Sequence, residues 1–370
     1  MNILLVNCIL VTAQKGVIPR RKSIKDTMIC NFAQGFINCG HSVTILTSAE
    51  FRPTECEEYP FNVVYFKSRW PKIFKPHLLP WPIGLHKYIK DNIDSFDMVI
   101  TSEAFSIATL MAAPACRRKL VVWQEMAMHQ RMMHKVPSIV WYNVFTRLFM
   151  RKALMVARSL PAMRFISQYA CNVASEIVDH GANGTVLFPS DTANDSFIIV
   201  SRLVPGKCID RILHKFSQFI KIPEFRHYKL NIVGDGIESD NLKQLTKQLC
   251  IDGNVVFHGF MQHSQFAEIL RSSKAMLIDT SNDLNMVSVP EAIVSGTPIV
   301  TNTLPTSAEF IANSGVGIAR DGWDASDLKH LVENYPKYHQ ACLDVRDELT
   351  RDGCARKMIR IFLDWKQSKQ

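Results

Sequence analysis

The stretch Asp279–Asn302, DTSNDLNMVSVPEAIVSGTPIVTN, predicts the fold of the chain around it. The apolar run AMLID (Ala275–Asp279) has the length of a buried strand, and PIVTN (Pro298–Asn302) has the length of another. Between them, Pro290 fits the first turn of a helix and Gly296 fits its end. A short helix between two buried strands is a βαβ unit of an open parallel sheet. Such sheets bind ligands at the carboxyl ends of their strands.

Two carboxylates, Asp283 and Glu291, flank the loop of this unit. The unpaired N–H groups of the helix start lie between them and form an anion site. A nucleotide sugar suits this combination, because it offers hydroxyls to the carboxylates and a diphosphate to the amides. In the alternative interpretation, Asp283 caps the loop and Glu291 only complements the helix dipole.

The run SVPEAIVSGTPIV resembles the C-terminal signature of the retaining GT-B glycosyltransferases of family 4, E-x7-E followed by A-x-A-x-G-x-P-V. The resemblance implies that Glu291 binds the ribose hydroxyls of the donor and that Asp283 binds a hydroxyl of the donor sugar. Asp283 stands where the family has Glu. The Phe-Gly that usually follows is replaced, and the expected donor-binding loop consists of Leu284, Asn285, Met286 and Val287.

Three further elements follow the order of this family. SRLVPGKC resembles its G-R-L-x-x-x-K-G element, which implies that Arg202 and Lys207 hold the donor diphosphate through charge-assisted bonds. The alternative is a surface pair near a helix start. Gly234 and Gly236 resemble the strand–GDG–helix turn beside the nucleotide. NVVFHGF resembles the next unit, in which the expected platform for the nucleobase is formed by His258, Gly259 and Phe260.

The first half matches the family only in outline. Its order of strand, loop, helix and strand resembles the first βαβ unit, in which Gly16 and Lys15 would face a phosphate or the acceptor. A solvated basic loop is the alternative. Glu125 ends an apolar run and, with His129, falls where the family presents side chains to the acceptor. For His129 a structural role is the alternative.

Composition and charge limit the classes of protein. The chain has 370 residues, 47% hydrophobic and 21% charged, which suits two globular domains. The net charge of +9 indicates a partner with phosphates: nucleic acid, an anionic membrane or a phosphorylated small molecule. The ten cysteines form no C-x-x-C pair, as expected in a reducing cytoplasm. No run is long enough to span a bilayer, and the apolar start reads as a first strand rather than a signal peptide.

Two segments combine apolar and basic residues. Phe66–Lys90 interleaves lysines and an arginine with aromatic residues and has no acid, which suits an anionic membrane surface or stacked single-stranded nucleic acid. An ordinary loop with buried aromatic residues is the alternative. Ser138–Ser159 is predicted to be one long helix, either on a membrane or in the core, and Met163–Ala170 is predicted to begin with a short strand.

These patterns lead to an α/β prediction: a GT-B fold with two Rossmann-like domains facing across a cleft. The expected domains are 1–188 on the acceptor side, 189–350 for the nucleotide sugar, and a C-terminal helix in 351–370 that packs on the first domain. The resemblance to the family implies the activity of a retaining hexosyltransferase of bacterial capsule, exopolysaccharide or O-antigen synthesis. No cofactor, metal or nucleic acid is expected.

The expected acceptor is a glycan or lipid-linked glycan, and an anionic membrane surface is a further expected partner. The expected location is cytoplasmic, with a peripheral position on the inner face of the membrane as a variant. Two other functions stay open. One is a GT-B nucleotide-sugar epimerase, and the other is a non-catalytic protein that binds a nucleotide sugar or glycan.

Overall fold

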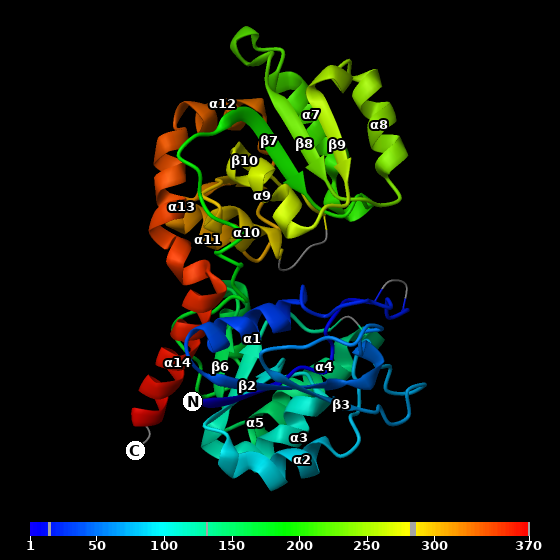
Figure 1. Cartoon of the computed structure of the whole chain (residues 1–370), viewed down its shortest axis with the longest axis vertical. Helices are drawn as coiled ribbons and strands as arrows, with labels where there is room; N and C mark the ends of the chain where they lie inside the picture. The colour runs from blue at the N-terminus through cyan, green and yellow to red at the C-terminus, as the bar shows by residue number, and fades with distance from the viewer. Residues whose placement is uncertain (14–15, 131, 282–285, 369–370) are drawn as a thin grey trace. The chain divides into compact units, whose positions relative to one another are not determined.

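Two parallel sheets of six strands each form the framework of the chain (Figure 1). The computed structural model describes residues 1–13, 16–130, 132–281 and 286–368. One unit consists of Met1–Gly181 with Arg351–Gln370, and the second consists of Ala182–Thr350. Counted along its own unit, each sheet has the strand order 3-2-1-4-5-6 of a doubly wound nucleotide-binding fold. The predicted pair of Rossmann-like sheets is thereby confirmed.

The sheet of the first unit runs in the order β3-β2-β1-β4-β5-β6. Its strands are β1 Asn2–Val6, β2 Ser42–Ser48, β3 Asn62–Phe66, β4 Met98–Ser102, β5 Leu120–Gln124 and β6 Leu154–Ala157. Its helices are α1 Met28–Asn38, α2 Leu85–Asn92, α3 Ile107–Cys116, α4 Val136–Val140, α5 Arg147–Phe149, α6 Leu160–Ile166 and α14 Arg351–Gln367. A π-helix, Trp141–Thr146, joins α4 to α5.

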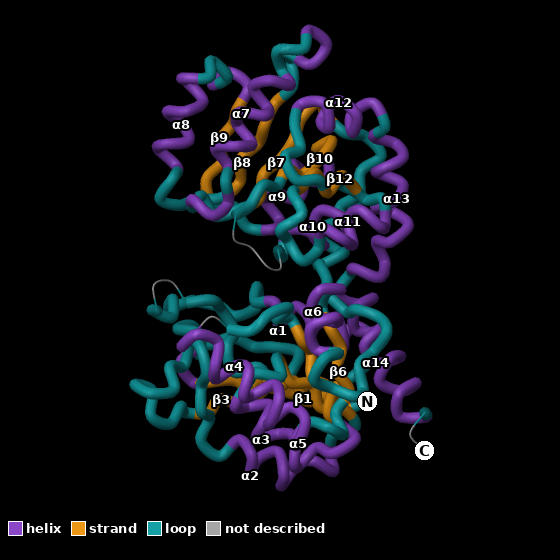
Figure 2. The backbone as a smooth tube through the Cα atoms, turned by 180° about the vertical axis from the view of Figure 1, so that it is seen from behind, coloured by secondary structure: helices purple, strands orange, loops and turns teal. Residues whose placement is uncertain are grey.

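Helices cover both faces of this sheet, which suits central strands that carry apolar residues on both faces. Successive side chains of a strand point to opposite faces. Ile3 and Leu5 of β1 therefore pack with residues of α1 and α14. Leu4 and Val6 pack with residues of α2 and α3 on the other face. Figures 1 and 2 show α1 on one side of the sheet and α2, α3 and α5 on the other.

The sheet of the second unit runs in the order β12-β11-β10-β7-β8-β9. Its strands are β7 Asn194–Val200, β8 Lys229–Val233, β9 Val255–Gly259, β10 Ser273–Leu277, β11 Ile299–Thr301 and β12 Gly317–Ala319. Its helices are α7 Ile209–Phe219, α8 Ser239–Gln248, α9 His263–Arg271, α10 Ser288–Val294, α11 Ala308–Ser314, α12 Ala325–Glu333 and α13 Tyr335–Leu349.

The βαβ unit expected in Asp279–Asn302 is confirmed. Strands β10 and β11 pair in parallel, with α10 between them in the chain. Gly296 follows α10 with φ of 73°, a left-handed conformation that glycine adopts at little cost. Every described residue of α10 is buried, because the helix packs between its sheet and α13.

The prediction of one long helix over Ser138–Ser159 is wrong. The helical part ends near Met150, and Leu154–Ala157 forms β6, which pairs in parallel with β5. The run Ala153–Ala157 is short and uniformly apolar, so its periodicity does not distinguish a buried strand from a buried helix. Pairing with β5, a contact between distant parts of the chain, decides the outcome.

The short strand predicted at the start of Met163–Ala170 is also wrong, because this part of the chain belongs to α6. Ser159 caps that helix: its hydroxyl accepts a hydrogen bond from the Ala162 N–H. Pro161 occupies the first turn, where its missing N–H costs nothing. Both signals were present in the sequence, just ahead of the segment that was interpreted as a strand.

The last helix, α14, belongs to the first unit and packs along α1. The chain leaves the first unit near Gly181 and returns to it at Arg351. Gly35 of α1 makes this contact close: a Cβ atom at Gly35 would lie 2.3 Å from the backbone oxygen of Arg351. The packing of α14 on α1 therefore depends on a missing side chain.

Gly35→Ala tests this contact. In an isolated helix the substitution stabilises by about 1 kcal/mol. Here the backbone of α14 must move, and overpacking of this kind costs about 1–3 kcal/mol. We expect a net loss in the free energy of unfolding, measured by urea titration, whereas Gly253→Ala, with open space around its Cβ position, serves as the control. A stabilised Gly35→Ala protein would contradict the contact.

Candidate functional site

The loops that follow β7 and β10 meet at the carboxyl edge of the second sheet. These two strands are neighbours, and the chain runs outward from them in opposite directions, which is the switch point where α/β sheets bind ligands. The backbone oxygen of Gly206 accepts hydrogen bonds from the Thr280 hydroxyl at 2.8 Å and from the Ser281 N–H at 3.1 Å. The two loops are thus joined at the Gly206 oxygen by one side-chain donor and one backbone donor.

Arg202 and Lys207 flank the turn after β7. Arg202 is exposed, and Lys207 ends a single 3-10 turn, Pro205–Lys207, before α7. Cys208, where the family has glycine, adopts a left-handed conformation with φ of 41°. This conformation explains why the family prefers glycine there, since a residue with a Cβ atom adopts it under strain.

The turn between β8 and α8 packs directly on this loop. A Cβ atom at Gly234 would lie 1.8 Å from the Ser201 oxygen, and one at Gly236 would lie 2.2 Å from the Leu203 oxygen. The Leu203 N–H donates to the Asp235 oxygen at 2.9 Å. Gly234 and Gly236 are therefore needed for backbone contact between two ligand-edge turns, apart from any contact that they make with a ligand.

Glu291 is buried at the start of α10, and its Oε1 lies 2.7 Å from Nε2 of His263. His263 begins α9, and its side chain is about half exposed. The pair joins the first turns of two helices on the ligand edge. Sequence reasoning missed His263; the available signal was its place at the start of the helix after β9.

The expected nucleobase platform divides into two kinds of residue. His258 is partly buried, its Nε2 lies 2.9 Å from Asn231 Oδ1, and burial lowers its pKa. Phe260, just after β9, is 80% exposed, and Ile237, just after Gly236, is 79% exposed. Phe260 and Ile237 thus offer apolar surface beside the glycine turn. Ile237 was missed, because one apolar residue in a polar stretch gives no signal.

The expected donor loop is only partly described. Met286 is buried and Val287 is about half exposed. Asp283, Leu284 and Asn285 lie outside the described residues, as does Lys15 in the first unit. Their assigned roles stay predictions.

In the first unit, three neighbouring strands each end in a charged residue. Glu103 follows β4, Glu125 follows β5 and Arg158 follows β6. Glu103 has φ of 65°, and its carboxylate accepts hydrogen bonds from the N–H groups of Glu125 at 2.7 Å and Met126 at 3.3 Å. It thereby fixes the start of the loop that carries Glu125. Sequence reasoning found only Glu125 of the three.

Arg158 is 5% exposed, and several partners balance its buried positive charge. Its guanidinium lies 2.5 Å from Glu125 and 3.4 Å from Asp179, and it stacks over the Trp123 ring. Although burial alone would raise the pKa of Asp179, His180 and Arg158 hold it well below its usual range. Burial raises the pKa of Glu103 to about 8, and the negative charge of Glu125 adds to that rise.

His129 is engaged on both ring nitrogens. Nδ1 lies 3.1 Å from the Ser138 hydroxyl, and Nε2 lies 3.0 Å from the Tyr169 hydroxyl. Burial lowers its pKa, and Lys135 contributes to the decrease. The structure does not bring His129 into direct contact with Glu125, and its bonds favour the structural interpretation.

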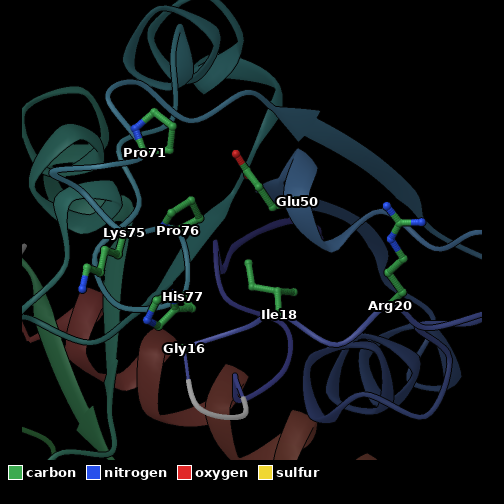
Figure 3. A pocket seen from close by; sticks show the side chains of 8 residues that line it. All are labelled: Gly16, Ile18, Arg20, Glu50, Pro71, Lys75, Pro76 and His77. Carbon is green, nitrogen blue, oxygen red and sulfur yellow. The ribbon is translucent and has the colours of Figure 1, made fainter.

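A hollow of about 480 Å³ lies over the carboxyl ends of β1, β2 and β3 (Figure 3). Its wall is formed by Gly16, Ile18, Arg20, Glu50, Pro71, Lys75, Pro76 and His77. Gly16, predicted to face a phosphate or the acceptor, has φ of 80° and lies 3.9 Å, measured from its Cβ position, from the His77 ring. Across the described parts of both units, no group of three or more His, Cys, Asp or Glu side chains could hold a metal ion.

Comparison with known proteins finds a family model that is similar to most of the second unit. Residues 188–338 match the family model described as Glycosyl transferases group 1. The chain is 29% identical over 179 residues to the uncharacterized glycosyltransferase MJ1607 of Methanocaldococcus jannaschii, covering 45% of this chain and 44% of that protein. It is 25% identical over 172 residues to alpha-monoglucosyldiacylglycerol synthase of Streptococcus pneumoniae, covering 46% and 38%. The matched segments thus span less than half of these relatives.

Among solved structures, HepE of Anabaena in complex with UDP is similar over 100% of this chain and 99% of that one, with a TM-score of 0.64 and 15% identity. At this identity the likeness shows the fold alone. The predicted GT-B fold is confirmed.

Glu103→Gln tests the charge state of the first-unit site. Below pH 4.5 both the folded and the unfolded chain hold the Glu103 proton, but between pH 4.5 and about 8 only the folded chain does. The free energy of unfolding of the parent protein therefore falls as the pH rises through this range, because folding keeps Glu103 protonated. In Glu103→Gln the side-chain amide does not titrate, so this loss is absent. We expect the variant to gain about 1–3 kcal/mol relative to the parent between pH 5 and pH 9.

Thermal melts across this pH range provide the measurement. Glu55→Gln, at an exposed ion pair with Lys22, is the control and should show no such trend. A stability difference between Glu103→Gln and the parent that stays constant with pH would contradict the raised pKa.

Proposed function

We propose that this chain, whose second unit carries a Glycosyl transferases group 1 domain in a GT-B fold, transfers a hexose from a nucleotide sugar to an acceptor hydroxyl with retention. The single observation that carries the proposal is the bonding of Gly206 to Thr280 and Ser281. This contact joins the Arg202–Lys207 turn to the loop that leads to Glu291. In this proposal, cations for a diphosphate and a carboxylate for hydroxyls act at the same switch point.

The donor is held mainly by the second unit in this proposal. Arg202 and Lys207 balance the charge that develops on the departing diphosphate, which is usually the largest electrostatic contribution to catalysis. Glu291 accepts hydrogen bonds from the ribose, and Phe260 offers its ring to the base. Asp283 orients the donor sugar. Because side chains balance the diphosphate, the proposal requires no metal ion.

A similar protein supports the donor class. HepE, which shares the fold, has been solved in complex with UDP. This supports a nucleotide-sugar donor for the present chain, and the group 1 match supports transfer as the reaction. We propose synthesis of a bacterial surface polysaccharide as the setting.

One observation favours a second candidate, a nucleotide-sugar epimerase. Such an enzyme needs a carboxyl group that holds a proton and another that is ionised. Glu103 has a raised pKa, and the neighbouring Glu125 forms an ion pair with Arg158, so the two could fill these roles. Incubation with UDP-glucose and GDP-mannose, with and without an acceptor, separates the two: epimerisation needs no acceptor, whereas transfer does.

We propose a peripheral position at an anionic membrane for the first unit. Along α4, the π-helix and α5, the exposed large apolar residues are Val136, Ile139, Val140, Val144, Leu148 and Phe149. No acid lies between Lys135 and Lys152, and Arg147 and Arg151 accompany the apolar residues. Such a basic and apolar surface suits the interface of an anionic bilayer.

The segment between β3 and α2 also exposes large apolar residues. Ile73 is 73% exposed, and Trp70, Leu78 and Ile83 are about half exposed. Trp70 nevertheless packs against Phe74 and Trp81, so part of the aromatic set is structural. In the part of the chain that the structure describes, no helix is both long and apolar enough to cross a membrane.

Arg202→Ala and Lys207→Ala test the donor site. Each should weaken binding of the donor nucleotide by about 1.5–3 kcal/mol, the usual contribution of a charge-assisted bond. Calorimetric titration with UDP and GDP measures the loss, with Lys221→Ala at the end of α7 as the control. If both variants bind UDP and GDP as tightly as the parent protein does, Arg202 and Lys207 do not belong to the donor site.

The membrane surface is tested by sedimentation with vesicles. The protein should pellet with phosphatidylglycerol vesicles at low salt and be released at high salt, because salt screens the attraction. Leu148→Asp, on the α5 surface, should reduce the bound fraction severalfold, because a charge replaces an apolar residue that is 69% exposed. Leu304→Asp, in the second unit, is the control. Equal binding to neutral and anionic vesicles would contradict the proposed position at an anionic membrane.

A further inference from the structure

The hollow in the first unit is built from three consecutive crossover loops. Gly16, Ile18 and Arg20 follow β1, and Glu50 follows β2. The remaining wall, Pro71 to His77, follows β3. Because β3, β2 and β1 are neighbours in the sheet, the hollow covers one half of its carboxyl edge. This is the edge where ligands of such sheets bind.

The wall of the hollow carries unbalanced positive charge. Arg20 and Lys75 are exposed and, within the described residues, neither side chain has an ion pair with a carboxylate. Figure 3 shows them on opposite sides of the hollow, with Ile18 and His77 between them. Glu50 is the acid of the wall, and its carboxylate accepts a hydrogen bond from the Ser68 hydroxyl at 2.9 Å. Two cations face one carboxylate, so the wall keeps an excess of positive charge.

The size and the other walls suit a sugar ring. Ile18, Pro71 and Pro76 contribute apolar surface, and ligand sites of this kind typically have volumes of about 300–1,000 Å³. Cations above apolar walls fit a ring that carries an anionic substituent. A neutral sugar would leave both cations without a partner.

The other half of the same edge carries two carboxyl groups beside the buried guanidinium of Arg158. Glu103 and Glu125 follow β4 and β5, on the far side of the switch between β1 and β4. Carboxylates suit the hydroxyls of a sugar, and cations suit a phosphate or carboxylate. An anionic group of an acceptor is therefore expected over β1–β3, because the carboxyl groups over β4 and β5 would repel it.

We propose that the hollow binds a phosphate or carboxylate of the acceptor, so that this transferase acts on an acidic glycan. Arg20 offers a planar pair of N–H donors that matches either group, and Lys75 offers a point charge from the opposite wall. That the ligand is the acceptor of a transfer reaction rests on the proposed function. That the hollow binds an anionic sugar does not.

Binding is measured first, without a donor. Protein NMR titrations with glucose 6-phosphate, methyl glucuronide and glucose should show both anionic sugars binding at least about tenfold more tightly than glucose. Arg20→Gln and Lys75→Gln should each remove most of that preference. Lys22→Gln, whose amine pairs with Glu55 outside the hollow, should retain it. Equal binding of charged and neutral sugars overturns the proposal.

Transfer is then measured with the same acceptors and a nucleotide sugar. The proposal predicts that Arg20→Gln raises KM for an anionic acceptor about tenfold, with the KM for the donor unchanged. If no acceptor receives sugar but the anionic preference in binding persists, the proposed function fails and the anion site stands. If acidic and neutral acceptors react equally well, the anion site fails and the transferase stands.

The anion has two possible sources, and further arms separate them. A short prenyl diphosphate sugar carries its charge in the lipid linkage, whereas glucose 6-phosphate and the glucuronide carry it on the sugar. Preference for either source supports the site and identifies which one it takes. Displacement of glucose 6-phosphate by phosphatidylglycerol vesicles, lost in Lys75→Gln, would show that the hollow serves the bilayer instead and would overturn the proposal.

Discussion

The backbone oxygen of Gly206 is the point on which the ligand edge of the second unit depends. It accepts hydrogen bonds from Thr280 and Ser281, which join the loop after β7 to the loop after β10. These loops belong to strands from which the chain diverges in opposite directions, so no local sequence signal places them together. The bond sets where Arg202 and Lys207 stand relative to the helix that carries Glu291.

Close backbone packing reinforces the same arrangement. Gly234 and Gly236 bring the turn after β8 against Ser201 and Leu203, at distances where a Cβ atom cannot stand. The Gly234 N–H also donates to the Gly259 oxygen at 2.8 Å, which adds the end of β9. Four strand ends are thereby joined through main-chain contacts.

At the carboxyl edge of the first sheet, charged side chains and not close backbone packing connect the loops. Its strands end in Glu103, Glu125 and Arg158, and burial makes their charges interdependent. Glu103 fixes the loop that follows β5 through two backbone N–H groups and adopts a left-handed backbone, while burial raises its pKa. Groups that are strained and electrostatically perturbed in this way are typical of functional edges.

The second unit could be predicted from local patterns, because Asp279–Asn302 contains its own strand, helix, glycine and strand signals. The turn glycines and the Arg202–Lys207 spacing were equally local. The segment around β6 could not be predicted, because its apolar run becomes a strand only by pairing with β5.

The unpredicted site residues share one property: distant parts of the chain give them their partners. His263 meets Glu291 across two βα units, and Arg158 meets Glu125 across neighbouring strands. Glu103 acts on backbone that follows another strand. In each case the sequence shows the residue type, but it does not show which distant residue the side chain contacts. The contacts of His129 with Ser138 and Tyr169 were equally invisible in the sequence, where its position suggested a side chain facing the acceptor.

The central claim is that the edge joined by Gly206 recognises the diphosphate of a nucleotide. Calorimetric titration of the parent protein with uridine, UMP and UDP tests it most directly, with the guanosine series in parallel. The account predicts that affinity rises with each phosphate and that the diphosphate binds at least about tenfold more tightly than the monophosphate. Equal affinities for the nucleoside and its diphosphate in both series would contradict it.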